Sequence, residues 1–258
     1  MSISLITNPV RKGVESMNKL LIIVSGIILL PLIAKIIPFL AELSSHHPAA
    51  SHRINDYLWV VNAGISNLYI ISNGRTYICI DAGSNLKRVK QDLSKLKINP
   101  DSVEAVFLTH SDRDHIAALD LFKKAQIYIS RDEGAMILTK KPRFSGFIRN
   151  KLPISYQTLS DGIEINAGGI IVLAIATPGH TPGSMSYLVN KHYLFTGDSL
   201  ALKDGKVSVF TPHFFNMDEV TAEASIIKLS QLKEITWLGT GHHGFTEISN
   251  LRWLNNEK

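Results

Sequence analysis

Hydrophobic positions along the chain follow two different spacings. Short apolar runs bounded by turn residues, in "YLWVVNAG", "NLYIISNG" and "TYICIDAG", predict three consecutive strands over residues 57–83. Asn73 and Gly74 separate two of these runs and predict a hairpin turn. Residues 85–97 instead carry leucine or valine at every third or fourth position, which predicts a helix with one apolar face.

The same two spacings continue through the C-terminal part of the chain. Helices are predicted at 114–124 and 217–232. Further strands are predicted at 103–109, 126–130, 154–159, 170–176, 185–189, 193–196 and 234–239. Strands mixed with helices in this way predict sheets covered by helices, an α/β fold. No repeat or low-complexity linker interrupts the pattern, so residues 51–258 are expected to form one domain.

The N-terminal segment has a different character. The stretch Leu20–Leu43 is almost entirely apolar, and three cations precede it. If the helix continues through Lys35, it is long enough to cross a bilayer, so residues 1–50 are expected to form a membrane anchor with its linker. A cleaved signal peptide, which would make the protein secreted, and an ordinary buried helix are the alternatives. The preceding cations place the N-terminus in the cytoplasm and the domain on the extracytoplasmic side.

Composition restricts the chemistry. The single cysteine, Cys79, lies in a strand pattern and is expected in the core, which excludes a disulfide framework and a cysteine-rich zinc site. Any bound metal would therefore need His, Asp or Glu ligands. The net charge of +5 is small for 258 residues, and no nucleic-acid partner is expected.

One local cluster of cations stands apart. The segment Lys140–Lys151 carries five Lys or Arg residues and no acidic residue, together with two phenylalanines. It could bind an anionic substrate, a phosphate-bearing lipid or the membrane surface. The alternative is a solvated loop.

Residues suited to metal binding gather at the ends of predicted strands. The sequence "THSDRDH", residues 109–115, places two histidines and two aspartates at the end of the predicted strand 103–109. Three more motifs have a polar side chain among small residues at a strand end: His180 in "ATPGHTPGS", Asp198 in "YLFTGDSL" and His242 in "WLGTGHHG". Loops at the carboxyl ends of strands commonly carry ligands in α/β layers, and the four clusters together predict a metal site.

These motifs, in this order and preceded by "ICIDAGS", resemble those of the metallo-β-lactamase superfamily of hydrolases over about residues 54–250. The resemblance implies a four-layer αβ/βα sandwich with the metals at the sheet edges. It assigns His110 and His180 to a first ion, Asp114, His115 and His242 to a second ion, and Asp198 to a bridge between them. Asp81, in the early motif, resembles a residue that braces the site.

The implied function is a metal-dependent hydrolase acting on a small-molecule substrate. Two divalent ions, zinc or alternatively manganese or iron, can hold a shared water as hydroxide near neutral pH. Asp114 is the candidate catalytic residue, because it could orient this hydroxide. The motif regions show neither a serine elbow nor a catalytic cysteine.

The family's chemistry does not select a substrate, because its members cleave β-lactams, thioesters, lactones and phosphodiesters. We expect ester or lactone cleavage ahead of phosphodiester cleavage. β-Lactamases with a cysteine ligand match less well, because no cysteine lies near "LFTGDSL". The alternatives are a β-lactam hydrolase and a non-catalytic binding protein with the same fold.

The chain departs from the family pattern at Asp112, where the family usually has its second histidine. As a ligand of the first ion, Asp112 would lower the site's charge by one and favour harder ions such as manganese. Alternatively, Asp112 lies behind the ligands or faces solvent. A second ambiguity is His243, although the position directly after the glycine favours His242. The remaining histidines are expected at the surface: His46, His47, His52, His192 and His213.

Overall fold

The computed structural model describes residues 46–139, 155–210 and 215–253, together with residue 152 and six positions between 33 and 44. The chain divides into two compact units, Met1–Ser44 and Ser45–Lys258. The cationic segment Lys140–Lys151 and His213 lie outside the described residues.

Most of the predicted anchor also lies outside the described residues. The six described positions of the first unit are helical, and Ile33, Ile36, Ile37 and Leu40 are exposed. None of the helices in the described part of the chain combines the length and the apolar composition that crossing a bilayer requires. The anchor therefore stays a prediction.

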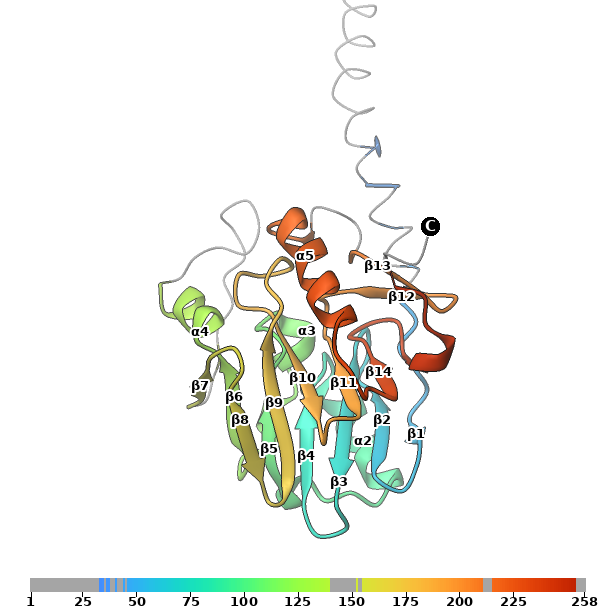
Figure 1. Ribbon diagram of the computed structural model, residues 1–258. Helices are drawn as coiled ribbons and strands as arrows, with labels where there is room; N and C mark the ends of the chain where they lie inside the picture. Colours follow the sequence, from blue (N-terminus) through green and yellow to red (C-terminus); the bar gives the residue numbers. More distant parts are fainter. Residues whose placement is uncertain are drawn as a thin grey trace, which may run out of the picture. The chain divides into compact units, whose positions relative to one another are not determined.

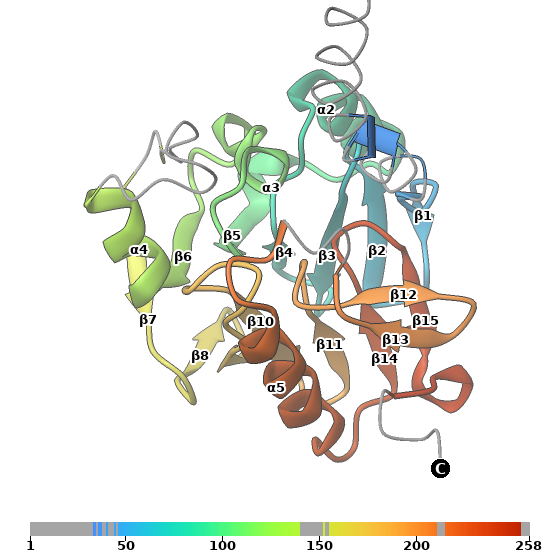
Figure 2. The ribbon, with the colours of Figure 1, turned by 90° about the horizontal axis from the view of Figure 1, so that it is seen from above.

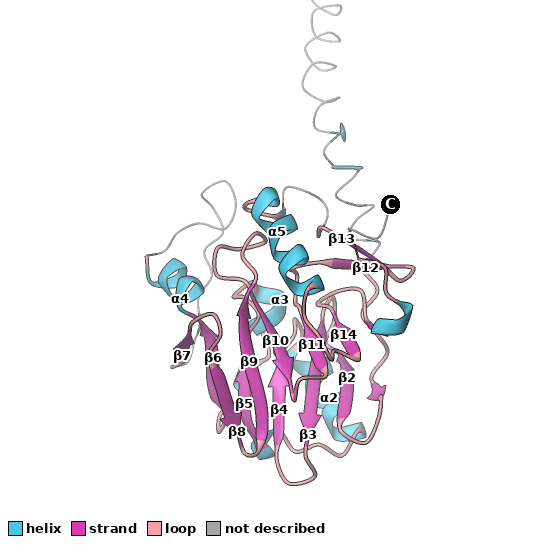
Figure 3. Ribbon diagram, in the orientation of Figure 1, coloured by secondary structure: helices cyan, strands magenta, loops and turns pink. Residues whose placement is uncertain are grey.

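The second unit contains two large sheets (Figures 1 and 3). The first has seven strands in chain order: β1 (His52–Arg53), β2 (Leu58–Asn62), β3 (Asn67–Ser72), β4 (Tyr77–Ile80), β5 (Val103–Phe107), β6 (Gln126–Ser130) and β7 (Gln157–Leu159). Strands β1 to β4 are antiparallel to their neighbours, whereas β4 to β7 are parallel.

The second sheet has six strands in the order β15-β14-β11-β10-β9-β8. Their bounds are β8 (Glu164–Ala167), β9 (Ile170–Ala176), β10 (Met185–Val189), β11 (Tyr193–Phe195), β14 (Trp237–Gly239) and β15 (Phe245–Glu247). A separate pair consists of β12 (Ala201–Lys203) and β13 (Lys206–Ser208). The helices are α2 (Leu86–Lys95), α3 (Arg113–Ile116), α4 (Arg131–Leu138) and α5 (Glu219–Ser230), with 3₁₀ turns at Pro100–Ser102, Leu119–Leu121 and Ile248–Asn250.

Three apolar cores separate four layers. Strand side chains alternate between faces, so Val106 of β5 packs with α2 while its neighbour Phe107 points the other way, into the core between the sheets. The third core joins the second sheet to Ile226 and Leu229 of α5. Figure 2 shows α2 and α5 on opposite outer faces of the stacked sheets. The predicted sandwich with helices outside is therefore confirmed, and Cys79 is buried as expected.

The predicted helix at 114–124 was wrong in extent. Helix α3 ends at Ile116, and only a 3₁₀ turn follows it. The carbonyl of His115 accepts hydrogen bonds from the backbone N–H groups of Ala82 and Gly83, at 2.7 and 3.1 Å. Because these tertiary bonds occupy the carbonyl that would extend the helix, the chain turns away after one turn.

Candidate metal centre

The four loops that carry the predicted metal-binding residues follow the carboxyl ends of β5, β9, β11 and β14. The structure brings all seven predicted metal-binding side chains into three overlapping groups, whose ligand atoms lie within 4.8 Å of one another. Two of them share no residue: the first group is His110, Asp112 and His180, and the second group is Asp114, His115 and His242. The remaining group, His110, His115 and Asp198, overlaps both.

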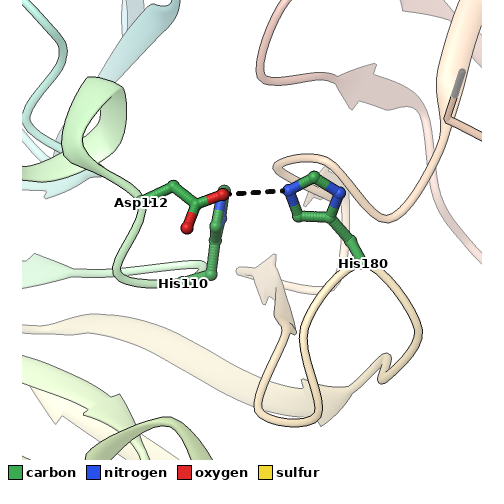
Figure 4. A group of neighbouring side chains, drawn as sticks. All are labelled: His110, Asp112 and His180. Atoms are coloured by element: carbon green, nitrogen blue, oxygen red, sulfur yellow. Dashed lines mark ion pairs between the residues drawn. The ribbon is translucent and has the colours of Figure 1, made fainter. Parts of the chain in front are cut away.

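The first group joins the loop after β5 to the loop after β9 (Figure 4). Asp112 Oδ2 lies 3.6 Å from His110 Nε2 and 3.4 Å from His180 Nε2. Asp112 occupies the N-cap position of α3, yet its side chain makes no capping hydrogen bond. An N-cap aspartate usually accepts from the helix backbone. Here the carboxylate is directed toward the two imidazoles instead, as a shared ligand of one ion would be.

The second group joins α3 to the loop after β14. Asp114 Oδ2 lies 3.6 Å from His115 Nε2 and 3.2 Å from His242 Nε2. Asp114 and His115 are adjacent in the single turn of α3, so this short helix presents two of the three donors. His242 joins this group, whereas His243 belongs to none of the three groups of described residues.

Asp198 lies between the two groups. Its Oδ2 is 3.5 Å from His180 Nε2 and 3.1 Å from His242 Nε2, and its Oδ1 is 3.4 Å from His115 Nε2. A Cβ added at Gly241 would clash with Asp198 Oδ1 and lie 2.9 Å from His115 Cε1, so only glycine lets the backbone pass this close. One buried carboxylate thus faces both groups, which is the placement of a bridging ligand.

Hydrogen bonds orient the Nε2 atoms of the histidines toward the cluster. His242 Nδ1 lies 2.6 Å from the carbonyl oxygen of Ile65, which can only accept, so His242 carries its proton on Nδ1. His180 Nδ1 lies 3.3 Å from Asn216 Oδ1, and the amide group of Asn216 donates to the carbonyl of Phe210. In both rings the proton on Nδ1 leaves the Nε2 lone pair available to a metal ion.

Asp81 orients the other two histidines, His115 directly and His110 through Thr109. His115 Nδ1 donates to Asp81 Oδ2 at 2.8 Å. Thr109 donates its N–H and its hydroxyl to Asp81, at 2.8 and 2.9 Å, which leaves the hydroxyl oxygen to accept from His110 Nδ1 at 3.0 Å. Asp81 itself adopts a φ of 61°, a left-handed conformation that costs about 1–2 kcal/mol in a non-glycine residue. The predicted bracing position of Asp81 agrees with these contacts.

The donor set fits divalent cations. Among the described residues, His110 Nε2 and Asp198 Oδ1 are buried without a hydrogen-bond partner. Buried polar atoms are nearly always partnered. Four such atoms of the described residues are not, and these two belong to the cluster, whereas His46 Nε2 and His243 Nδ1 do not. Imidazole nitrogen and carboxylate oxygen are ordinary ligands of zinc and also suit manganese and iron.

The electrostatics of the cluster favour positive charge. Burial by itself lowers the pKa of His242, but the Asp198 and Asp114 carboxylates outweigh burial and raise it to about 10. Burial by itself raises the pKa of Asp114, but the charge of His115 and the contact with His242 lower it to about 2. The carboxylates therefore stabilise either protons on the imidazoles or cations between them.

Two aromatic side chains near the cluster were not anticipated. The ring of His46 stacks on that of His242, and Phe210 lies 5.1 Å from the ring of His180, centroid to centroid. The expected surface position of His46 is wrong, because residues after Ser45 fold back onto the domain and Ala49 N donates to Asn67 Oδ1. Neither residue belongs to a motif, so no local signal marks it. The exposed positions of His47, His52 and His192 are confirmed.

A family model described as "Metallo-beta-lactamase superfamily" matches residues 61–242, a range that contains all seven side chains. The chain belongs to the metallo-β-lactamase superfamily.

Three matches illustrate its relationships within this superfamily. The probable polyketide biosynthesis zinc-dependent hydrolase BaeB of Bacillus velezensis is 31% identical over 162 residues, covering 60% of this chain and 62% of BaeB. A hydroxyacylglutathione hydrolase of Brucella anthropi is 33% identical over 154 residues, covering 59% and 51%. The crystal structure of the BLEG-1 B3 metallo-beta-lactamase matches with a TM-score of 0.60 and 25% identity, covering 75% and 95%. The chain thus spans less than two thirds of the length of the two curated relatives.

Proposed function

We propose that this member of the metallo-β-lactamase superfamily is a metal-dependent hydrolase that holds two divalent ions. The observation that carries the proposal is the position of Asp198, whose carboxylate faces His180 on one side and His115 and His242 on the other. A single ion would need only the first group or the second group. The relative named as a zinc-dependent hydrolase adds support.

The first and second groups would each hold one ion. His110, Asp112 and His180 would bind the first, Asp114, His115 and His242 the second, and Asp198 would contact both. Ions bound there would activate a water molecule for attack and polarise the bond that it attacks. Asp114 is suited to orient this water, because its side chain is 23% exposed, against 4% for Asp198, and its pKa of about 2 keeps it an acceptor.

Asp112 sets the net charge of this centre. Two divalent ions bring four positive charges, and the carboxylates of Asp112, Asp114 and Asp198 remove three of them. A neutral histidine in place of Asp112 would leave the centre more positive by one charge. We therefore infer a centre that accepts zinc but tolerates manganese or iron better than an all-imidazole first group would, because carboxylate oxygen is a harder donor.

We propose a carboxylic ester or lactone as the substrate class. The name of the hydroxyacylglutathione hydrolase denotes hydrolysis at an acyl group, which supports carbonyl over phosphodiester chemistry. β-Lactam hydrolysis is the second candidate, favoured by the likeness to the BLEG-1 structure. The second group takes its three donors from Asp114, His115 and His242, so the absence of a nearby cysteine does not count against this candidate.

The deciding experiment combines metal analysis with a substrate panel on the full chain. We expect about two ions per chain and turnover of an aryl ester or a lactone. The panel should include a chromogenic cephalosporin and an aryl phosphodiester, with His180→Ala as the matched inactive control. A wild-type chain that binds no metal and cleaves nothing on the panel would favour the non-catalytic binding protein.

We further propose that Leu20–Leu43 anchors the chain in a membrane, with the metal centre on the extracytoplasmic side. The apolar run, the preceding cations and the exposed apolar positions Ile36 and Ile37 support this. Fractionation should find the full chain with membranes and a chain beginning at Ser45 in the aqueous phase. Protease added outside intact cells should reach the domain. Recovery of the untrimmed full chain in the aqueous phase would contradict the anchor.

A further inference from the structure

Asp81 is not the only buried carboxylate that lies near the described metal-binding groups without belonging to them. Another lies beside the first group. Glu133, in the first turn of α4, is fully buried. Its Oε1 accepts hydrogen bonds from the backbone N–H of Ser111 at 2.9 Å and from the Ser111 hydroxyl at 2.6 Å. Its Oε2 accepts from the Thr181 hydroxyl at 2.7 Å. Both oxygens of this side chain are thus used by other segments of the chain.

The two partners of Glu133 are the sequence neighbours of the first group. Ser111 lies between His110 and Asp112, and Thr181 directly follows His180. The loop after β5 and the loop after β9 are otherwise far apart in the sequence. Through one carboxylate, α4 therefore links the two loops that together would hold the first ion.

The local sequence favours a different use of this side chain. Ser130, the N-cap of α4, accepts from the backbone N–H of Glu133 at 3.1 Å, so the pattern Ser-x-x-Glu matches a capping box. In a capping box the glutamate would reach back to the N-cap N–H. Here its oxygens accept from Ser111 and Thr181 instead, so only one of the two capping-box hydrogen bonds, the one from the Glu133 N–H to Ser130, is made.

The backbone also brings α4 unusually close to the loop after β9. A Cβ added at Gly183 would lie 2.5 Å from Glu133 Cα and 2.6 Å from Glu133 Cβ, so this position accepts only glycine without displacing the helix. The Ser130 hydroxyl at the N-cap of α4 donates to the Gly183 carbonyl, and the Thr181 hydroxyl donates to Glu133 Oε2 at 2.7 Å. The loop is therefore held against α4 at more than one point.

We propose that Glu133 is a positioning residue that sets the distance between the His110–Asp112 loop and His180, and thereby the affinity for the first ion. The proposal rests on the proposed function. The second group has its own supports, Asp81 for His115 and the Ile65 carbonyl for His242, and neither contacts Glu133. Loss of Glu133 should therefore weaken the first ion while leaving the second in place.

Cobalt titration of the metal-free full chain tests the proposal without relying on turnover. Partners behind metal ligands typically contribute about 10- to 100-fold in affinity. We expect Glu133→Gln to weaken one of two cobalt-binding steps by about this factor and to alter the visible absorption of that step only. The matched control is Asp132→Asn, the exposed neighbour on the same helix, which should leave both steps unchanged.

Two further variants keep the test decisive if Glu133→Gln does not fold. Ser111→Ala and Thr181→Val each remove one partner of the carboxylate, and each should weaken the same cobalt step. Equal weakening of both cobalt-binding steps would overturn the positioning role. So would two unchanged steps in all three variants. A wild-type chain that binds no cobalt would instead refute the proposed function, so the two failures can be told apart.

Discussion

The ring of His46 stacks on the ring of His242, with centroids 4.2 Å apart and planes inclined by 24°. This contact joins the start of the folded domain to a histidine of the second metal-binding group. The pKa of His46 falls to about 4, first because of burial and then because of the positive charge of His242. At neutral pH His46 is therefore a neutral ring that covers one face of His242.

Truncation can therefore test whether the segment that contains His46 supports binding of the second ion. A chain that begins at His46 should keep both ions. A chain that begins at His52 loses the stacked ring and the bond from Ala49 to Asn67, and we expect a several-fold weaker second ion and a lower melting temperature. Metal titration and thermal melting of both chains check this. Equal affinities would show that His46 does not support the site.

Removal of a metal-binding side chain should differ from removal of its support. His180→Ala and Asp198→Ala should each reduce activity below detection and lower the metal content, because one removes a ligand of the first ion and the other the shared carboxylate. Asp81→Ala removes only the hydrogen bonds to Thr109 and His115, and should cost about 10- to 100-fold. Metal content and kcat/KM should be measured on the same samples. Full activity in either ligand variant would refute the two-ion centre.

Asp112 offers the most direct test of the unusual donor. Asp112→Ala should lose the first ion, whereas Asp112→His should keep two ions and shift preference from manganese toward zinc, because imidazole replaces a hard oxygen donor. The same replacement raises the charge of the centre by one, so the acidic limb of the pH–rate profile should move to lower pH. Unchanged metal content in Asp112→Ala would show that Asp112 is not a ligand.

Metal uptake should release protons. Burial lowers the pKa of His242, but Asp198 and Asp114 raise it to about 10, so the metal-free ring is protonated at neutral pH. A metal ion must displace this proton, and affinity should therefore rise with pH until about pH 10. Calorimetry in buffers of different ionisation enthalpy measures the protons released. Affinity that does not change between pH 6 and 8 would contradict the raised pKa.

The metal-free protein should show the matching change in stability. The folded-state pKa of His242, about 10, lies above its ordinary value of 6.5, so its contribution to stability is complete below pH 6.5 and is lost as the pH rises to about 10. We expect the melting temperature of the metal-free chain to fall over this interval. A His242→Gln chain is the matched control, because it lacks the titrating ring and should show a weaker fall.

The sequence by itself determined the layered arrangement of sheets and helices and six side chains of the candidate metal centre, while it left Asp112 open. These six side chains lie shortly after the ends of predicted strands, so the sequence pattern brings them to the edges of the sheets. The alternation in β5 likewise assigns Val106 and Phe107 to opposite faces. Such signals are readable because they depend on neighbours in the chain.

Only the tertiary structure decided the positions of Glu133, His46 and the carboxylate of Asp112. Glu133 lies in a Ser-x-x-Glu pattern that predicts a helix cap, and its use by Ser111 and Thr181 depends on loops that the sequence does not relate to it. His46 precedes the domain and meets His242 only after the chain folds back. In each case the deciding contact joins residues distant in the chain, and local patterns carry no information about such contacts.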